Sequence, residues 1–122
     1  MESVSAVIKK KGKVLLNQRP PTGLLGGLWE FPNWKIELKQ RSRLRRRLRN
    51  YIKKEMGMNV EVKKSLGTFK QTYSHFKLTL YVFKCEAIDG RGRGKWVDIR
   101  DFDQFAMSRI DRRIAYALSI GR

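Results

Sequence analysis

The feature that most constrains this chain is a segment from about residue 74 to Cys85 in which apolar side chains occupy both sets of alternating positions. One side of an extended chain would carry Phe76, Leu78, Leu80 and Val82, and the other side Tyr81, Phe83 and Cys85. A preceding segment with similar alternation begins at Val60 and runs toward Phe69. The pattern predicts two consecutive strands with a turn at residues 72–75 between them.

Residues 41–56 have a different period. Their apolar positions are three and four residues apart, which predicts one stripe of an amphipathic helix. The stripe consists of Leu44, Leu48, Tyr51, Ile52 and Met56. Gly57 supplies a stop just past the end, while Ser42 or Asn33 could supply the beginning.

The remaining segments complete an α+β pattern. Alternation from Val4 to Ile8, a glycine-containing turn and residues 14–16 predict an N-terminal hairpin. Trp96 and Val97 predict a last short strand, followed by helical segments at 101–106 and 108–119, the second capped by Ser108. The buried stripe of that helix would be Ile110, Ile114, Ala117 and Leu118. The order of elements indicates a mixed β-sheet with a helix on each face, in one domain spanning residues 1–122.

The net charge indicates the kind of partner. The 28 Lys and Arg residues against 11 Asp and Glu give a formal charge of +17, which attracts polyanions. From Arg41 to Lys54 there are eight basic residues and no acidic one. A solvated helix face is the alternative explanation, yet this concentration favours contact with nucleic-acid phosphates. The candidates are Arg43, Arg45, Arg46, Arg47 and Arg49 on the helix, and Arg91 and Arg93 on a glycine-rich loop.

Other features exclude membrane and secreted classes. No apolar run approaches the roughly 20 residues that cross a bilayer, and the N-terminus lacks the order of a signal peptide. The single cysteine, Cys85, cannot form an internal disulfide and is expected to be packed in a strand. We therefore expect an intracellular protein, either cytoplasmic and associated with the nucleoid or nuclear.

The stretch from Arg19 to Pro32, RPPTGLLGGLWEFP, is the most distinctive in the chain. Taken alone, it predicts a glycine-rich loop that presents Leu24, Leu25, Leu28 and Trp29 around a strand, and the residues by themselves favour a loop that only caps the core. It closely resembles the C-terminal domain of the A/G-specific adenine DNA glycosylases, the MutY family, and the resemblance extends over nearly the whole chain. That resemblance implies a fold similar to the Nudix hydrolases and a role in clamping DNA opposite the adenine to be removed.

The Nudix signature itself is largely absent. Aligned on Gly57, the chain has Ile36 in place of the first glycine and Ser42 in place of the first glutamate. Asn50-Tyr51 replaces Arg-Glu, and Lys54-Glu55 replaces the glutamate pair, so that only Glu55 remains. A lone carboxylate among cations is a poor Mg²⁺ ligand set. We therefore expect no metal site and no catalysis by this domain.

Residues 72–75, Thr-Tyr-Ser-His, lie at the turn between the two strands. From the residues alone, Ser74 would be a turn hydroxyl and His75 a structural hydrogen-bonding residue. The resemblance implies more, because the family has a Phe-Ser-His triplet here that senses 8-oxoguanine. It thus implies that Tyr73, Ser74 and His75 recognise a base, with Tyr73 departing from the usual phenylalanine.

The resemblance also implies a missing partner. A glycosylase of this family needs a catalytic domain that flips and excises adenine, and that domain carries an iron–sulfur cluster for which this chain lacks the cysteines. The chain is therefore expected to be a C-terminal fragment that has no cofactor of its own and works with an N-terminal glycosylase domain on double-stranded DNA containing 8-oxoguanine. An active Nudix pyrophosphohydrolase and a general basic nucleic-acid-binding module remain the alternatives.

Overall fold

A computed structural model describes residues 1–23 and 25–120 of the chain. The strands are β1 (Glu2–Lys10), β2 (Lys13–Gln18), β3 (Trp29–Glu30), β4 (Asn33–Ile36), β5 (Asn59–Tyr73), β6 (Phe76–Asp89) and β7 (Lys95–Asp98). The helices are α1 (Leu44–Met56), α2 (Arg109–Ile120) and the short 3₁₀ helices η1 (Leu38–Gln40) and η2 (Ile99–Gln104). Leu24, which the sequence placed in the glycine-rich loop, lies outside the described residues.

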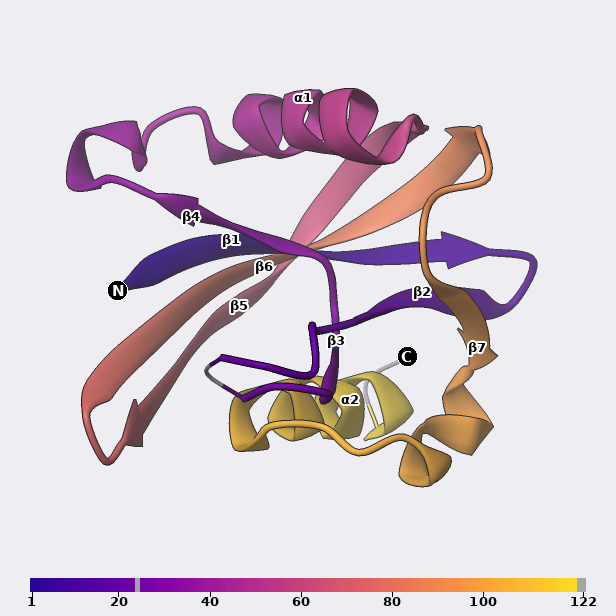
Figure 1. The fold of residues 1–122 in the computed structure, drawn as a ribbon. Coiled ribbons are helices and arrows are strands. Elements are labelled where there is room, and N and C mark those ends of the chain that lie inside the picture. Colours follow the sequence, from indigo (N-terminus) through magenta and orange to yellow (C-terminus); the bar gives the residue numbers. More distant parts are fainter. Residues whose placement is uncertain (24, 121–122) are drawn as a thin grey trace.

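The strands form one mixed sheet, as predicted. Its main order is β3-β2-β1-β6-β5, with β4 paired to β1 and β7 paired to β2. The β1 and β6 strands run parallel, whereas β1 with β2 and β5 with β6 run antiparallel. Helices α1 and α2 cover opposite faces of this sheet (Figure 1). No helix in the described part of the chain is long and apolar enough to span a membrane.

The β5–β6 hairpin is the longest element and confirms the two predicted strands. Its register runs from the Asn59–Asp89 pair to the Tyr73–Phe76 pair. The strands therefore end later than predicted, at Tyr73 and Asp89, while β6 begins at Phe76 rather than near residue 74. Between them, Ser74 and His75 form the turn. The register shifts around Ser65, where Lys63 and Lys64 break the apolar alternation.

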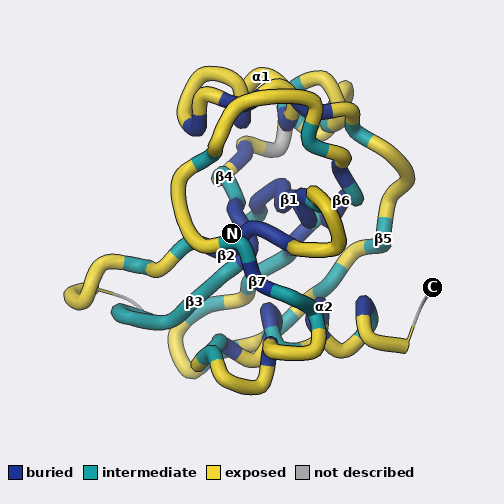
Figure 2. The backbone as a smooth tube through the Cα atoms, turned by 90° about the vertical axis from the view of Figure 1, so that its right-hand side faces the viewer, coloured by how far each residue is buried: buried dark blue, intermediate teal, exposed yellow. Residues whose placement is uncertain are grey.

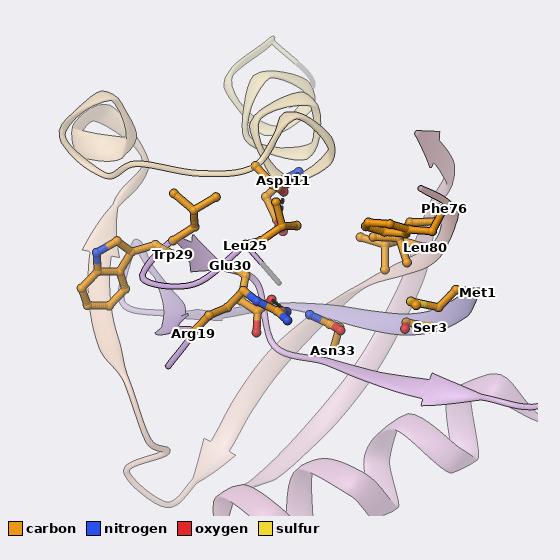
Figure 3. A pocket seen from close by; sticks show the side chains of 13 residues that line it. Met1, Ser3, Arg19, Leu25, Trp29, Glu30, Asn33, Phe76, Leu80 and Asp111 are labelled. Carbon is orange, nitrogen blue, oxygen red and sulfur yellow. Dashed lines mark hydrogen bonds and ion pairs between the residues drawn. The ribbon is translucent and has the colours of Figure 1, made fainter. Parts of the chain in front are cut away.

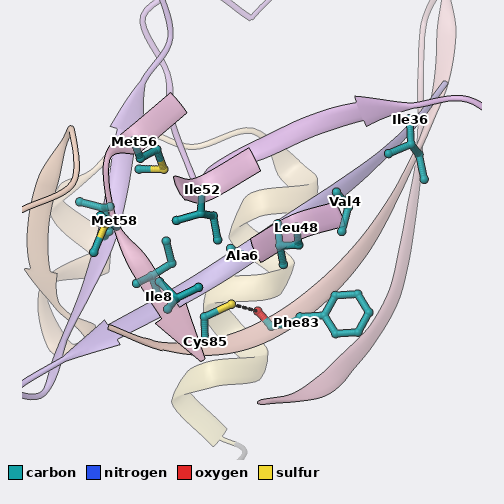
Figure 4. Close-up of a cluster of buried hydrophobic side chains, with 12 residues drawn as sticks. Val4, Ala6, Ile8, Ile36, Leu48, Ile52, Met56, Met58, Phe83 and Cys85 are labelled. Carbon is teal, nitrogen blue, oxygen red and sulfur yellow. Dashed lines mark hydrogen bonds between the residues drawn. The ribbon is translucent and has the colours of Figure 1, made fainter. Parts of the chain in front are cut away.

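Two hydrophobic cores lie on the two sides of the sheet. The core under α1 includes Leu48 and Ile52 from the helix and Phe83 and Cys85 from β6 (Figure 4). The core under α2 includes Leu80 and Val82 from the other side of β6. Alternate residues of β6 thus enter different cores, as the sequence predicted. Figure 2 shows the buried backbone concentrated between the two helical layers.

The helix boundaries differ from the predictions. Residues 41–43 are not part of α1, which begins at Leu44, and Arg43 takes the N-cap position with a left-handed φ of 59° and no side-chain cap. Neither Ser42 nor Asn33 therefore begins the helix. Gly57, with φ of 64°, ends it as predicted.

The C-terminal helical segments agree with the prediction only in part. The segment predicted at 101–106 is the 3₁₀ helix η2 at Ile99–Gln104. The prediction for Ser108 was correct, because its Oγ accepts a hydrogen bond from the N–H of Asp111 at 3.4 Å at the start of α2. In the buried stripe of α2, Ala115 is buried and Ala117 only half-buried.

Candidate nucleic-acid interface

The predicted base-recognition residues lie at the tip of the β5–β6 hairpin. Ser74 and His75 are exposed in the turn, whereas Tyr73 is half-buried in the last position of β5. The ring of Tyr73 stacks on that of Phe76, with centroids 4.9 Å apart and an interplanar angle of 19°. The structure thus brings Tyr73, Ser74 and His75 together, with the serine and histidine facing solvent.

A hydrogen bond connects this tip to α2. The backbone N–H of Ile110 donates to the hydroxyl of Tyr73 at 3.4 Å. Ile110 lies in the first turn of the helix, where backbone N–H groups lack a partner within the helix. The stack on Phe76 and this bond hold the base of the turn against the body of the protein.

Four basic residues surround the tip and were not singled out from the sequence. They are Lys70 and Lys77 on the hairpin and Arg109 and Arg113 on α2. All four are exposed. A signal was present in the sequence, since no acidic residue occurs between Glu61 and Glu86.

The side chain of Arg113 makes contacts within the protein. Its Nη1 donates to the backbone carbonyl of Lys70 and, at 3.4 Å, to Oε1 of Gln71. Its guanidinium lies over the ring of Phe69, 5.7 Å from the centroid. Arg113 therefore fastens β5 to α2 close to the tip, rather than standing free for a ligand.

The predicted backbone-binding arginines of α1 and of its N-cap position, Arg43, divide into two groups. Arg45 donates to the carbonyls of Val62 and Lys63 and lies over the ring of Phe83, and Nε of Arg47 donates to the carbonyl of Ser42 at 3.2 Å. In contrast, the structure records no side-chain hydrogen bond or ion pair among the described residues for the exposed arginines of the second group. These are Arg43, Arg46 and Arg49.

Arg91 and Arg93 lie in the loop between β6 and β7, at the opposite end of the hairpin from Ser74. The 14 residues of β6 separate the two ends, a length of roughly 45 Å for an extended strand. The carbonyl of Arg91 accepts from Nε1 of Trp96 at 3.1 Å, which anchors this loop to β7. The predicted base-recognition and loop residues therefore do not form one compact site.

Glu55, the remaining carboxylate of the Nudix signature, lines an open groove of about 460 Å³. Its Oε1 accepts from the indole Nε1 of Trp34 at 3.1 Å. Glu30 lines the same groove and is paired with Arg19 at 3.0 Å, and Arg93 adds a further positive charge. Within residues 1–23 and 25–120, no three His, Cys, Asp or Glu side chains are grouped so as to hold a metal ion.

A smaller pocket of about 70 Å³, room for a few water molecules, lies between β6 and α2 (Figure 3). Phe76, Leu78 and Leu80 line it from β6, and Asp111 lines it from α2. The carboxylate of Asp111 accepts from the Ser108 hydroxyl at 2.9 Å and from the N–H of Phe31 at 3.2 Å. Burial nevertheless raises the pKa of Asp111 to about 7, because a charged carboxylate is poorly solvated there.

Comparison with known proteins shows similarity to two groups, the NUDIX domain family and the adenine DNA glycosylases. A family model described as the NUDIX domain matches residues 3–117. The chain is 30% identical to human adenine DNA glycosylase over 92% of its length, covering 22% of that protein. It is also 37% identical to the CTP pyrophosphohydrolase of Escherichia coli K12, over 61% of the chain and 53% of the hydrolase.

Solved structures show the same fold. The C-terminal domain of mouse MUTYH, in a complex with human PCNA, superposes with a TM-score of 0.72 at 24% identity, covering 97% of this chain and 86% of that one. The chain spans only 13% to 24% of the length of the glycosylases that it matches.

Proposed function

Because this chain belongs to the Nudix domain family, and because its sequence is similar to that of adenine DNA glycosylases, we propose that it acts in DNA repair as a DNA-reading module of such an enzyme. In this proposal it binds double-stranded DNA and recognises 8-oxoguanine opposite adenine. The observation that carries the proposal is the exposed pair Ser74 and His75 on a turn that is held in place by Tyr73.

The chemistry of the oxidised base fits a serine. Guanine presents N7 as an acceptor on its major-groove edge, whereas 8-oxoguanine presents an N7–H donor and a carbonyl at position 8. A hydroxyl can accept from N7–H, and a hydroxyl or backbone N–H can donate to the new carbonyl. Ser74 would make this contact, and His75 would support it or contact a phosphate. The ring of Tyr73 would supply the aromatic surface that the family's phenylalanine supplies.

We propose that the domain is not itself a catalyst. A pyrophosphohydrolase of this family would use several carboxylates to hold Mg²⁺, since hard divalent cations take oxygen ligands. This chain supplies one at the signature positions, Glu55, which already accepts from Trp34 and shares its groove with Arg93. The residues present therefore do not fit the metal, and the hydrolase alternative has the weaker support.

The adenine-excising activity would belong to an N-terminal glycosylase domain, which we propose as the functional partner. The iron–sulfur cluster of such enzymes would belong there too, because four thiolates are needed and this chain has only the buried Cys85. A role of this kind would place the chain with intracellular DNA, in the nucleoid or the nucleus.

The decisive experiment compares two duplexes that differ only in the base opposite adenine. Affinities for the 8-oxoguanine·adenine and guanine·adenine duplexes are measured at low salt with the wild type, Ser74→Ala and a matched control, Ser42→Ala. Ser42 is exposed and lies before α1, away from the tip. A hydrogen-bond contact worth about 1–3 kcal/mol corresponds to a roughly 5- to 150-fold preference for the oxidised base. We expect Ser74→Ala to abolish this preference and Ser42→Ala to keep it.

Two other results would favour the alternatives. Equal affinities of the wild type for both duplexes, unchanged in Ser74→Ala, would indicate a general basic nucleic-acid-binding module. Mg²⁺-dependent turnover of a nucleotide pyrophosphate by the purified chain, lost in Glu55→Gln, would indicate the hydrolase.

A further inference from the structure

We propose that Lys70 and Lys77 bind two DNA phosphates beside the base contacted by Ser74, and that they hold the hairpin tip in register with that base. This inference rests on the proposed function. It extends that function to new residues, because none of the arginines expected to bind the DNA backbone lies on the hairpin. The partner is a duplex phosphate backbone, recognised by paired cations and hydroxyl groups.

The strand register places both lysines on one face of the hairpin. Lys70 is paired with Thr79, and Thr72 is paired with Lys77. Directly opposed residues of an antiparallel pair project to the same side, and so do residues two apart on one strand. The four side chains thus form a cross-strand square in which the two lysines are diagonal, roughly 7–8 Å apart by the usual geometry of such pairs.

This square is separate from both cores. The even-numbered residues of β6, such as Leu78 and Leu80, point toward α2, whereas Lys77 and Thr79 lie on the opposite face of the strand. Lys70, Thr72 and Lys77 are exposed, and a groove of about 190 Å³ runs along this part of the hairpin between the two lysines. Two ammonium groups and two hydroxyl groups around one groove are donors that suit phosphate oxygens.

In the part of the chain that the structure describes, no acidic side chain forms an ion pair with Lys70 or Lys77. Glu2 lies opposite Thr79 in the β1–β6 pairing, and its carboxylate accepts two hydrogen bonds from Arg41. Bringing a phosphate to this face therefore gains attraction and releases counterions without breaking an existing salt bridge.

Contacts with α2 hold the hairpin in place at the positions of the two lysines. Arg113 donates to the carbonyl of Lys70 itself, and Tyr73 contacts both Phe76 and the start of α2. The position of the lysine backbones relative to Ser74 is thus set by the same contacts that support the turn. Phosphate contacts here would fix where along the DNA strand Ser74 contacts a base. Backbone contacts have this positioning role in DNA-binding proteins.

The test is the salt dependence of binding to the 8-oxoguanine·adenine and guanine·adenine duplexes, using the whole 122-residue chain. The test variant is Lys70→Gln/Lys77→Gln. The matched control is Lys11→Gln/Lys64→Gln, which removes the same charge from two exposed lysines away from the tip. Thermal unfolding of both variants verifies that each retains its fold.

Each phosphate contact contributes about 0.9 to the slope of log K against log salt concentration. We expect the slope to fall by roughly 1.8 in the test variant on both duplexes. Between 50 and 200 mM salt, the test variant would then lose roughly tenfold less affinity than the wild type. The control pair should leave the slope unchanged, because charges beyond the screening length of about 8–10 Å act weakly.

The outcomes separate this inference from the proposed function. An unchanged slope in Lys70→Gln/Lys77→Gln, or an equal decrease in the control pair, would overturn the phosphate contacts whatever the preference between duplexes. A reduced slope in a chain that does not distinguish the two duplexes would retain the phosphate contacts and overturn base reading. The supporting result is a reduced slope together with a weaker preference for 8-oxoguanine in the test variant. A reduced slope with the preference fully intact would retain the phosphate contacts and overturn the role of the two lysines in setting the register.

Discussion

The backbone N–H of Ile110 donates a hydrogen bond to the side-chain hydroxyl of Tyr73, 3.4 Å away, and so joins the start of α2 to the turn between β5 and β6. A phenylalanine at this position would keep the aromatic ring but could not accept such a bond. The tyrosine thus keeps the aromatic ring that stacks on Phe76 and adds a polar contact to the helix. Its hydroxyl is structural in this geometry.

Replacing the tyrosine by phenylalanine separates these two contributions. Tyr73→Phe keeps the stack on Phe76 and removes only the acceptor for the Ile110 N–H. We expect the free energy of unfolding to fall by about 0.5–1.5 kcal/mol, the usual net value of one hydrogen bond, as measured by urea denaturation. The preference for 8-oxoguanine over guanine should persist, because the ring and Ser74 are retained.

Tyr73→Ala is the informative comparison for that variant, because it removes the ring as well. We expect it to lower both stability and the preference between the two duplexes. A loss of preference in Tyr73→Phe equal to that in Tyr73→Ala would mean that the hydroxyl itself contacts DNA.

Asp111 makes stability depend on pH. Its pKa is about 7 in the folded chain, raised chiefly by burial, against an ordinary value of 3.8. Between these two values the unfolded chain gives up a proton that the folded chain keeps, so the unfolded state binds fewer protons and stability decreases as pH rises. Above about pH 8 both states are ionised and this contribution to the slope ends.

We therefore expect the wild type to lose roughly 3 kcal/mol between pH 5 and pH 8 through this group, since each pH unit below the folded-state pKa contributes about 1.4 kcal/mol and the slope declines above it. Asp111→Asn removes the titration and should flatten that part of the profile. Urea unfolding of both proteins at several pH values measures the difference. Parallel profiles for the two proteins would show that Asp111 is already ionised in the folded chain.

Cys85 should be inert in the folded protein. The thiol is fully buried in the core under α1, and burial raises its pKa to about 12, so that almost no thiolate forms near neutral pH. We expect a thiol reagent to label the chain only after denaturant is added, as followed by mass spectrometry. Rapid labelling under native conditions, in a chain with unchanged circular dichroism, would contradict this arrangement of the core.

The fold was predictable because the spacing of apolar residues along each segment indicates a strand or a helix. Alternation from residue 76 to 85 identified β6 and assigned its two faces, which enter the two cores. The start of α1 was not predictable in this way. Arg43 adopts a left-handed conformation at the N-cap without a side-chain cap, and such a position has no compositional signal.

The site was predictable only in part, for a related reason. Tyr73, Ser74 and His75 are consecutive, so a resemblance over a short stretch could identify them. Lys70 and Lys77 become neighbours only through the pairing of β5 with β6, and Ile110 meets Tyr73 from 37 residues away in the chain. Patterns within one segment cannot reveal contacts that strand register and helix packing create.

The arginines of α1 provide the last prediction, because two groups with the same charge have different surroundings. Arg45 donates to two carbonyls of β5 and lies 5.2 Å from the ring centroid of Phe83, whereas Arg46 and Arg49 are exposed without such contacts among the described residues. Arg45→Gln should therefore lower the free energy of unfolding by about 1 kcal/mol, the value of a few exposed polar and cation–π contacts.

Arg46→Gln/Arg49→Gln should leave stability nearly unchanged or raise it slightly, because removing like charges on one helix relieves repulsion. If these side chains contact phosphates, the same variant lowers the slope of log K for DNA binding against log salt concentration, here called the salt slope, by up to about 1.8. Urea denaturation and salt titration of both variants distinguish the roles. A salt slope that falls in Arg45→Gln but not in Arg46→Gln/Arg49→Gln would reverse the assignment, and would place the DNA-facing side of α1 toward β5.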